Sequence, residues 1–145
     1  MDALTGDFYA ASAAACAARY DEAHVTSLHA LLRSLATKGH RVLDIGGGSG
    51  RDAAFMVELG CDVTYTDGCR EMVDEGVRLH PELAQHARVA PFPLAEDDEL
   101  LSQRFDLILC IAVIMHLKDA CLERLASQVA EMLPAGGQLV LSHSY

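Results

Sequence analysis

Several features of common protein classes are scarce in this chain of 145 residues. It has only four prolines, and no apolar run reaches the roughly 18 to 20 residues of a membrane-spanning helix. Its first residues lack the basic cluster that opens a signal peptide. With 51% hydrophobic and 22% charged residues, the chain is neither disordered nor collagen-like. We therefore expect one globular domain, 1–145, located in the cytoplasm.

Basic residues are outnumbered. Eleven Lys and Arg face twenty-one Asp and Glu, which gives a formal net charge of −10 at pH 7. Such a charge repels phosphate backbones and anionic lipid. We therefore expect neither nucleic acid nor a membrane as a partner.

Metal-binding and disulfide motifs are also lacking. The five cysteines are odd in number, and none belongs to a C-x-x-C pair or lies at zinc-site spacing from a histidine. The seven histidines include no H-E-x-x-H motif. The sequence predicts reduced thiols, mostly buried, and no metal site.

Apolar periodicity predicts alternating strands and helices. Helical spacing occurs at 24–37, 51–59, 72–79 and 122–133, and short apolar runs predict strands at 41–46, 61–67, 87–90, 105–112 and 138–144. Asp119 is expected to cap the last helix, the Ala-rich 10–18 to form an N-terminal helix, and 91–103 to be a loop with one helical turn. This order predicts an α/β fold with a doubly wound, mainly parallel sheet of about five strands, covered by helices on both faces.

A glycine-rich segment follows the first strand, where open α/β sheets bind ligands. It reads Asp44-Ile45-Gly46-Gly47-Gly48-Ser49-Gly50. Without side chains the backbone can approach a ligand closely, and the N–H groups of the following helix favour anionic groups. A simple turn from strand to helix is the alternative. Because an acid precedes four glycines among five residues, we favour a ligand loop.

Asp67 ends the second predicted strand, 17 residues after Gly50. A carboxylate at this spacing can accept hydrogen bonds from both hydroxyls of a ribose, although a helix cap is the alternative. A nicotinamide dinucleotide would also suit these features, since residues 48–53 match G-x-G-x-x-A. Asp44 disfavours it, because a carboxylate there crowds a pyrophosphate and suits an ammonium group. The sequence also lacks a catalytic Tyr-x-x-x-Lys pair.

Four segments in order carry a family resemblance. VLDIGGGSGRD at 42–52 resembles the D-x-G-x-G-x-G motif of class I S-adenosylmethionine-dependent methyltransferases, and VTYTDGCREMV at 63–73 resembles their second motif. RFDLILCIAVIMHL at 104–117 is similar to the fourth-strand motif, and LPAGGQLVLS at 133–142 to the segment leading into the fifth strand. The resemblance implies a Rossmann-like core at 39–145 after N-terminal helices at 1–38. It also implies S-adenosylmethionine as cofactor and methyl transfer to an acceptor that is by default a small molecule.

The resemblance also implies site residues. The methionine moiety would contact Asp44, Gly46, Gly48 and Gly50, the ribose Asp67, and the adenine the stretch from Gly68 to Met72. Cys110, Ile111 and Ala112 would lie near the sulfonium. Many members place an Asp after the third strand, but this chain has none there. The adenine would then be held by backbone groups and Phe92, or by Glu96 or Asp97.

Aromatic and histidine residues complete the implied site. Tyr20, with Tyr9 second, would close over the cofactor, and a helix-packing aromatic is the alternative reading. Methyl transfer needs alignment more than catalytic groups, but a hydroxyl acceptor benefits from a general base. His116 is the catalytic candidate and His143 the second, with a packing histidine as the alternative for each.

One departure from the family concerns the C-terminal strands. The family sheet normally has seven strands, whereas the strands predicted here stop at the fifth, so the last two are missing from the prediction. Leu139, Val140 and Leu141 would then form an exposed edge, which soluble proteins avoid. A fragment, a compact variant, or a homodimer or partner chain covering this edge would account for it. The alternative function is a non-catalytic methyltransferase-like domain that acts as a cofactor-binding or scaffold subunit.

Overall fold

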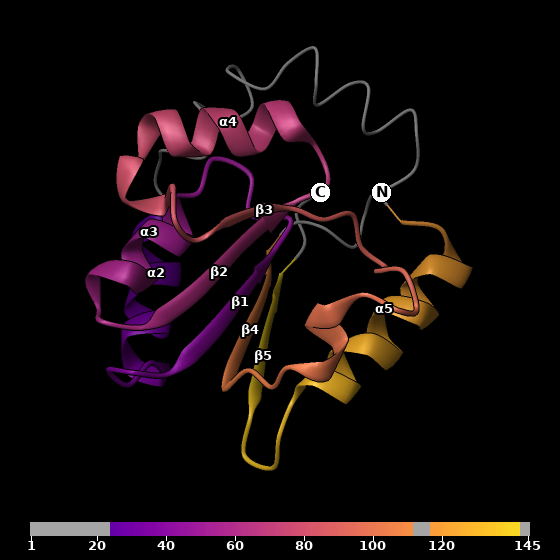
Figure 1. Ribbon diagram of the computed structural model, residues 1–145. Coiled ribbons are helices and arrows are strands. Elements are labelled where there is room, and N and C mark those ends of the chain that lie inside the picture. The colour runs from indigo at the N-terminus through magenta and orange to yellow at the C-terminus, as the bar shows by residue number, and fades with distance from the viewer. Residues whose placement is uncertain (1–23, 112–116, 143–145) are drawn as a thin grey trace.

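The computed structural model describes residues 24–111 and 117–142 (Figure 1). The helices and strands, in chain order, are α2 (His24–Leu35), β1 (Arg41–Ile45), α3 (Arg51–Glu58), β2 (Asp62–Asp67), α4 (Arg70–Leu79), the 3-10 helix η1 (Pro81–Leu83), β3 (Ala87–Val89), the 3-10 helix η2 (Glu99–Ser102), β4 (Leu107–Ile111), α5 (Asp119–Met132) and β5 (Gln138–Ser142). The five predicted strands and the four helices predicted after residue 23 are therefore confirmed.

The strands form one parallel sheet in the order β3-β2-β1-β4-β5. β1 (RVLDI) and β4 (LILCI) lie in its middle and are buried almost throughout, as parallel strands covered on both faces are. The chain runs outward from β1 through β2 to β3, and then returns to the other side of β1 with β4. The strand order therefore reverses next to β1, which is where open α/β sheets bind their ligands.

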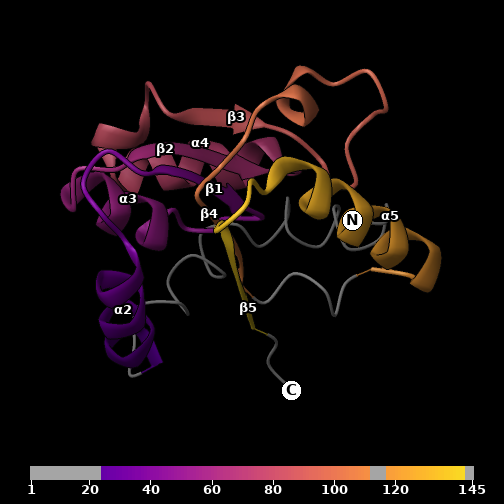
Figure 2. The ribbon, with the colours of Figure 1, turned by 90° about the horizontal axis from the view of Figure 1, so that it is seen from below.

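Helices cover both faces of the sheet, as predicted. In Figure 1, α2 and α3 lie to the left of the sheet and α5 lies to its right. In the rotated view of Figure 2, α2 and α5 again lie on opposite sides of the strands. One core joins α2, α3 and α4 to residues such as Val42, Val63 and Tyr65. The other joins α5 to Leu43, Ile108 and the segment after β3. No helix in the described ranges is long and apolar enough to cross a membrane.

Some boundaries differ from prediction. α2 ends at Leu35, two residues early, and β4 begins at Leu107, two residues late. The Phe105 N–H donates to the Met132 carbonyl, 2.9 Å away, and not to a neighbouring strand. The predicted cap of α5 is wrong: Lys118 is the N-cap, without a side-chain hydrogen bond, and Asp119 is already helical. The 3-10 helix η1 was not predicted, whereas η2 is the predicted helical turn.

β5 forms one edge of the described sheet. Leu139 is 41% exposed and Leu141 is 50% exposed, whereas Val140 between them is buried. The strand therefore leaves apolar side chains at the surface of the described part of the chain. That a second copy or a partner covers them stays a prediction.

Candidate functional site

The glycine loop turns tightly between β1 and α3. Gly48 has φ +57°, in the left-handed region that favours glycine. Gly47 is confined by its neighbours, since an added Cβ would lie 2.6 Å from Asp44 Oδ2 and from two ring carbons of Tyr65. β2 supports the loop, because the Gly47 N–H donates to the Thr66 carbonyl at 2.7 Å. Close packing and backbone conformation both require glycine in this loop.

Asp44 lies beneath this loop near the end of β1. Its residue is 1% exposed, and its Oδ2 has no hydrogen-bond partner in the described structure. Burial, followed by the charges of Asp52 and Asp67, raises the pKa of the Asp44 carboxyl well above its usual value. Buried polar atoms are nearly always hydrogen-bonded, so an unpartnered oxygen close to two further acids is a candidate acceptor for a cationic donor. An ammonium group would meet that need.

Asp67 ends β2 and is 4% exposed. Its Oδ2 accepts from the Gly48 N–H at 3.1 Å, and its Oδ1 accepts from the Cys69 N–H at 3.0 Å. Burial raises the pKa of Asp67, although backbone N–H donors, Cys69 first, act in the opposite direction. A carboxylate has about four lone-pair sites, so acceptor capacity remains for ribose hydroxyls. The bond to Cys69, the N-cap residue of α4, also gives Asp67 part of the capping role considered as the alternative.

A third acid at this end of the sheet was not predicted as a site residue. Asp52, in the first turn of α3, is 8% exposed, and its Oδ1 lies 2.9 Å from His29 Nε2 on α2. The His29 ring also packs on Phe55, with centroids 4.0 Å apart. Because 23 residues separate His29 from Asp52, no local sequence pattern predicts their contact. The contact holds α2 beside the first turn of α3.

Two predicted residues follow Asp67. Gly68 is half-buried, directly after β2. Met72 lies in α4, is 2% exposed, and its carbonyl is 3.3 Å from the Tyr65 hydroxyl. Both therefore lie on the segment that begins at Asp67, and their contact with an adenine stays a prediction.

Three predicted residues belong to β4 and to the segment after β3. Ile111 ends β4 and is half-buried. Burial, followed by the charge of Asp44, raises the pKa of the neighbouring Cys110 to about 12. Phe92 is 5% exposed and belongs to the core on the α5 face. Its predicted contact with adenine stays a prediction.

Other predicted residues lie outside the described ranges. They are Tyr9, Tyr20, Ala112, His116 and His143. The predicted closing tyrosine and the predicted general base therefore stay predictions.

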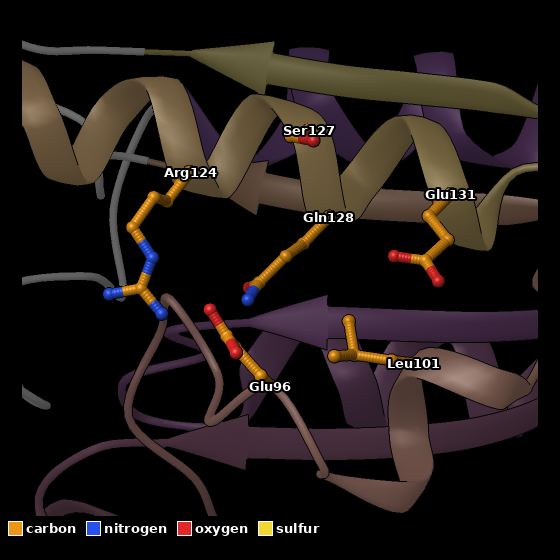
Figure 3. Close-up of a pocket in the computed structure, with 6 residues that line it drawn as sticks. All are labelled: Glu96, Leu101, Arg124, Ser127, Gln128 and Glu131. Atoms are coloured by element: carbon orange, nitrogen blue, oxygen red, sulfur yellow. The ribbon is translucent and has the colours of Figure 1, made fainter.

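A pocket of about 320 Å³ lies between α5 and the segment after β3. Figure 3 shows Glu96 facing Gln128, with Arg124 and Glu131 projecting from α5 on either side of Gln128. Gln128 binds the backbone of Leu94 twice, accepting from its N–H and donating to its carbonyl, both at 2.8 Å. Glu96 thus borders α5, and the adenine roles predicted for Glu96 and the exposed Asp97 stay predictions.

The cysteines and the possible metal ligands among the described residues form no further site. Cys61, Cys69 and Cys110 are free and buried, and Cys121 is free and half-buried. The predicted burial of most thiols is thus observed for these four, and their reduced state stays a prediction. Within 24–111 and 117–142, no three side chains of His, Cys, Asp or Glu gather in a way that could hold a metal ion.

Two curated relatives with matching sequence are ubiquinone biosynthesis O-methyltransferases. The chain is 33% identical over 108 residues to a ubiquinone biosynthesis O-methyltransferase of Cereibacter sphaeroides, covering 74% of this chain and 42% of the relative. It is 27% identical over 113 residues to the protein of that name in Coxiella burnetii, covering 76% and 46%. The chain therefore spans less than half the length of these relatives.

A solved structure and a family model agree with these relatives. The TehB-like SAM-dependent methyltransferase of Corynebacterium glutamicum superposes with a TM-score of 0.71 and 25% identity, covering 97% of this chain and 73% of that one. The expected Rossmann-like methyltransferase fold is thereby confirmed. The model of a methyltransferase domain matches residues 17–144, nearly the whole sequence. The chain belongs to the methyltransferase-domain family.

Proposed function

We propose that this chain binds S-adenosylmethionine beyond the carboxyl ends of β1 and β2 and transfers its methyl group to a small-molecule acceptor in the cytoplasm. The unpartnered, buried Oδ2 of Asp44 beside the glycine loop carries this proposal. A carboxylate in that state calls for a cation, and the cofactor has both an ammonium and a sulfonium group. Membership of the methyltransferase-domain family supports the same ligand.

Each site residue has a task in this proposal. Asp44 holds the ammonium group, and Asp67 accepts from the ribose hydroxyls with the lone pairs that Gly48 and Cys69 leave free. The glycine loop allows close approach of the backbone. When bound, the cofactor would supply an activated methyl group for transfer to the acceptor.

The protein's contribution to this chemistry is mainly alignment. In-line displacement is accelerated by holding the reacting atoms in a near-attack arrangement. The relatives are named O-methyltransferases, so hydroxyl-bearing small molecules are the first acceptors to test. For such an acceptor, His116 is the proposed general base, because an imidazole titrates near neutral pH.

Calorimetric titration with S-adenosylmethionine and with S-adenosylhomocysteine tests the cofactor site. We expect dissociation constants on the order of micromolar for both. Asp67→Asn should weaken them by about tenfold, since it removes a charged acceptor. Asp74→Asn removes an equal charge from the exposed surface of α4 and should change neither. Absence of binding by the folded wild-type chain would contradict the proposal.

Transfer of a labelled methyl group to a panel of hydroxyl-bearing small molecules tests catalysis. Labelled product that depends on Asp67 supports the enzyme. Cofactor binding without transfer to any member of the panel favours the alternative, a cofactor-binding or scaffold subunit.

A further inference from the structure

Tyr65 is a buried residue of β2 that the sequence motifs do not single out. Its exposed fraction is 0%, and it belongs to the core shared with α3 and α4. A buried phenol needs a hydrogen-bond partner. The Tyr65 hydroxyl donates to the Gly48 carbonyl at 2.5 Å, and the Met72 carbonyl is farther away at 3.3 Å. The side chain therefore reaches from the sheet to the glycine loop.

The Tyr65 ring also fills space left by glycines on two elements. An added Cβ at Gly47 would lie 2.6 Å from ring carbons Cδ1 and Cε1. An added Cβ at Gly76, in the middle of α4, would overlap the hydroxyl oxygen. The ring thus lies between the loop and α4 and sets their separation.

Gly48 is held at both ends of its backbone by β2. Its N–H donates to Asp67 and its carbonyl accepts from Tyr65. Tyr65 and Asp67 are two residues apart, so their side chains leave the same face of the strand. Together they fix the orientation of a residue whose φ lies in the left-handed region.

We propose that Tyr65 is a positioning residue of the cofactor site: its hydroxyl holds the Gly48 carbonyl and its ring spaces the loop from α4, so that the loop is preformed for its ligand. This inference rests on the proposed function for the identity of that ligand. A preformed loop binds more tightly because less ordering accompanies binding. Tyr65 itself need not touch the cofactor.

Tyr65→Phe is the direct test, with Val63→Ala as the matched control. Val63 lies two residues earlier on the same face of β2 and is 2% exposed. We expect Tyr65→Phe to weaken S-adenosylhomocysteine binding about three- to tenfold, the usual effect of one hydrogen bond. Val63→Ala should lower the melting temperature at least as much, through lost packing, and leave the dissociation constant unchanged. Equal affinities for Tyr65→Phe and wild type, or equal weakening in the control, would overturn the inference.

Amide exchange of glycine-labelled protein without ligand provides a readout independent of the proposed function. The Gly48 amide should exchange faster in Tyr65→Phe than in wild type, and Val63→Ala should not alter it. If wild type fails to bind S-adenosylhomocysteine, the proposed function fails, and this measurement alone decides whether Tyr65 holds the loop. An unchanged Gly48 amide would count against that role.

Gly76→Ala approaches the same contact from α4. The new methyl group overlaps the hydroxyl oxygen and displaces the ring, so ligand binding should weaken. Adding Tyr65→Phe removes the nearest overlapping atom, the hydroxyl oxygen, and leaves ring carbon Cζ at 2.9 Å, so it should restore part of the lost affinity. No restoration in the double variant would contradict the proposed spacing role.

Discussion

Gln128 on α5 and Asp44 on β1 are both buried polar side chains, but their hydrogen bonding differs. The two amide atoms of Gln128, which is 8% exposed, are both bonded to the backbone of Leu94. Asp44 is 1% exposed and has an oxygen without a partner. The first arrangement is complete without any ligand, whereas the second is not. For these two residues, burial accompanies a structural role where the hydrogen-bond partners are present and a candidate ligand site where one is absent.

Gln128→Leu should give the largest loss of stability. It leaves the Leu94 N–H without its partner, and the Leu94 carbonyl keeps only the 3.3 Å contact with Arg124. We expect the free energy of unfolding, measured by urea denaturation, to fall by about 2 kcal/mol. Ser127→Ala, on the exposed neighbour, should change it by less than about 0.5 kcal/mol. Equal stability of the two variants would contradict the structural role of Gln128.

Asp44→Asn should have effects of opposite sign on binding and on stability. It removes a charge that burial disfavours, so the unligated protein should melt at a higher temperature. It also removes the negative charge proposed to bind the ammonium group, so S-adenosylmethionine should bind about tenfold more weakly. Asp62→Asn, on a side chain that is 68% exposed, should change neither quantity appreciably. A variant with lower stability and unchanged affinity would reverse the interpretation of Asp44.

The stability cost of the buried Asp44 charge should also show in how stability depends on pH. The pKa of Asp44 is raised in the folded chain, mainly by burial, above its usual 3.8. Between 3.8 and that raised pKa the folded state binds more protons, so this contribution to stability is complete below the window and is lost as pH rises through it. The melting temperature of wild type should therefore fall relative to Asp44→Asn as pH rises from about 4 towards neutrality. A difference that grows instead towards acid pH would exclude this account.

The smallest expected effect concerns two thiols. Burial raises the pKa of Cys110 to about 12, with Asp44 adding to the shift, whereas Cys121 is only half-buried. Since the thiolate is the reactive form, iodoacetamide at about pH 8 should modify Cys121 well before Cys110 in the folded protein. Peptide mass spectrometry measures both, and in urea the two rates should converge. Comparable rates in the folded chain would show that Cys110 is more accessible than described.

The elements of the fold were predictable because their signals are local. Apolar runs and helical periodicity place every described strand and the helices α2 to α5. The cap of α5 was not predictable, because Lys118 and Asp119 are adjacent and either residue type can precede a helix. The boundary of β4 depends on Phe105, whose N–H is bonded to Met132, 27 residues away in sequence.

The site was predictable only in part, because only some of its residues belong to a pattern that is local in sequence. Asp44, Asp67 and the glycines between them belong to a spaced pattern that the sequence alone shows. Gln128 and Tyr65 do not, since a glutamine on a helix resembles a solvated residue and a tyrosine in a strand resembles ordinary core. Only the folded chain shows that each contacts the backbone of another segment.

The close packing of Tyr65 against Gly76 also limits which substitutions these two positions can accept during evolution. A side chain at 76 overlaps the phenol, so Gly76 cannot gain one while Tyr65 is kept and the loop keeps its shape. Relatives with a small residue in place of Tyr65 are free to carry a larger one in place of Gly76, and those that keep the tyrosine should keep the glycine. The two positions should therefore covary across the family, and a chimera that exchanges β2 without α4 should fail where a joint exchange succeeds.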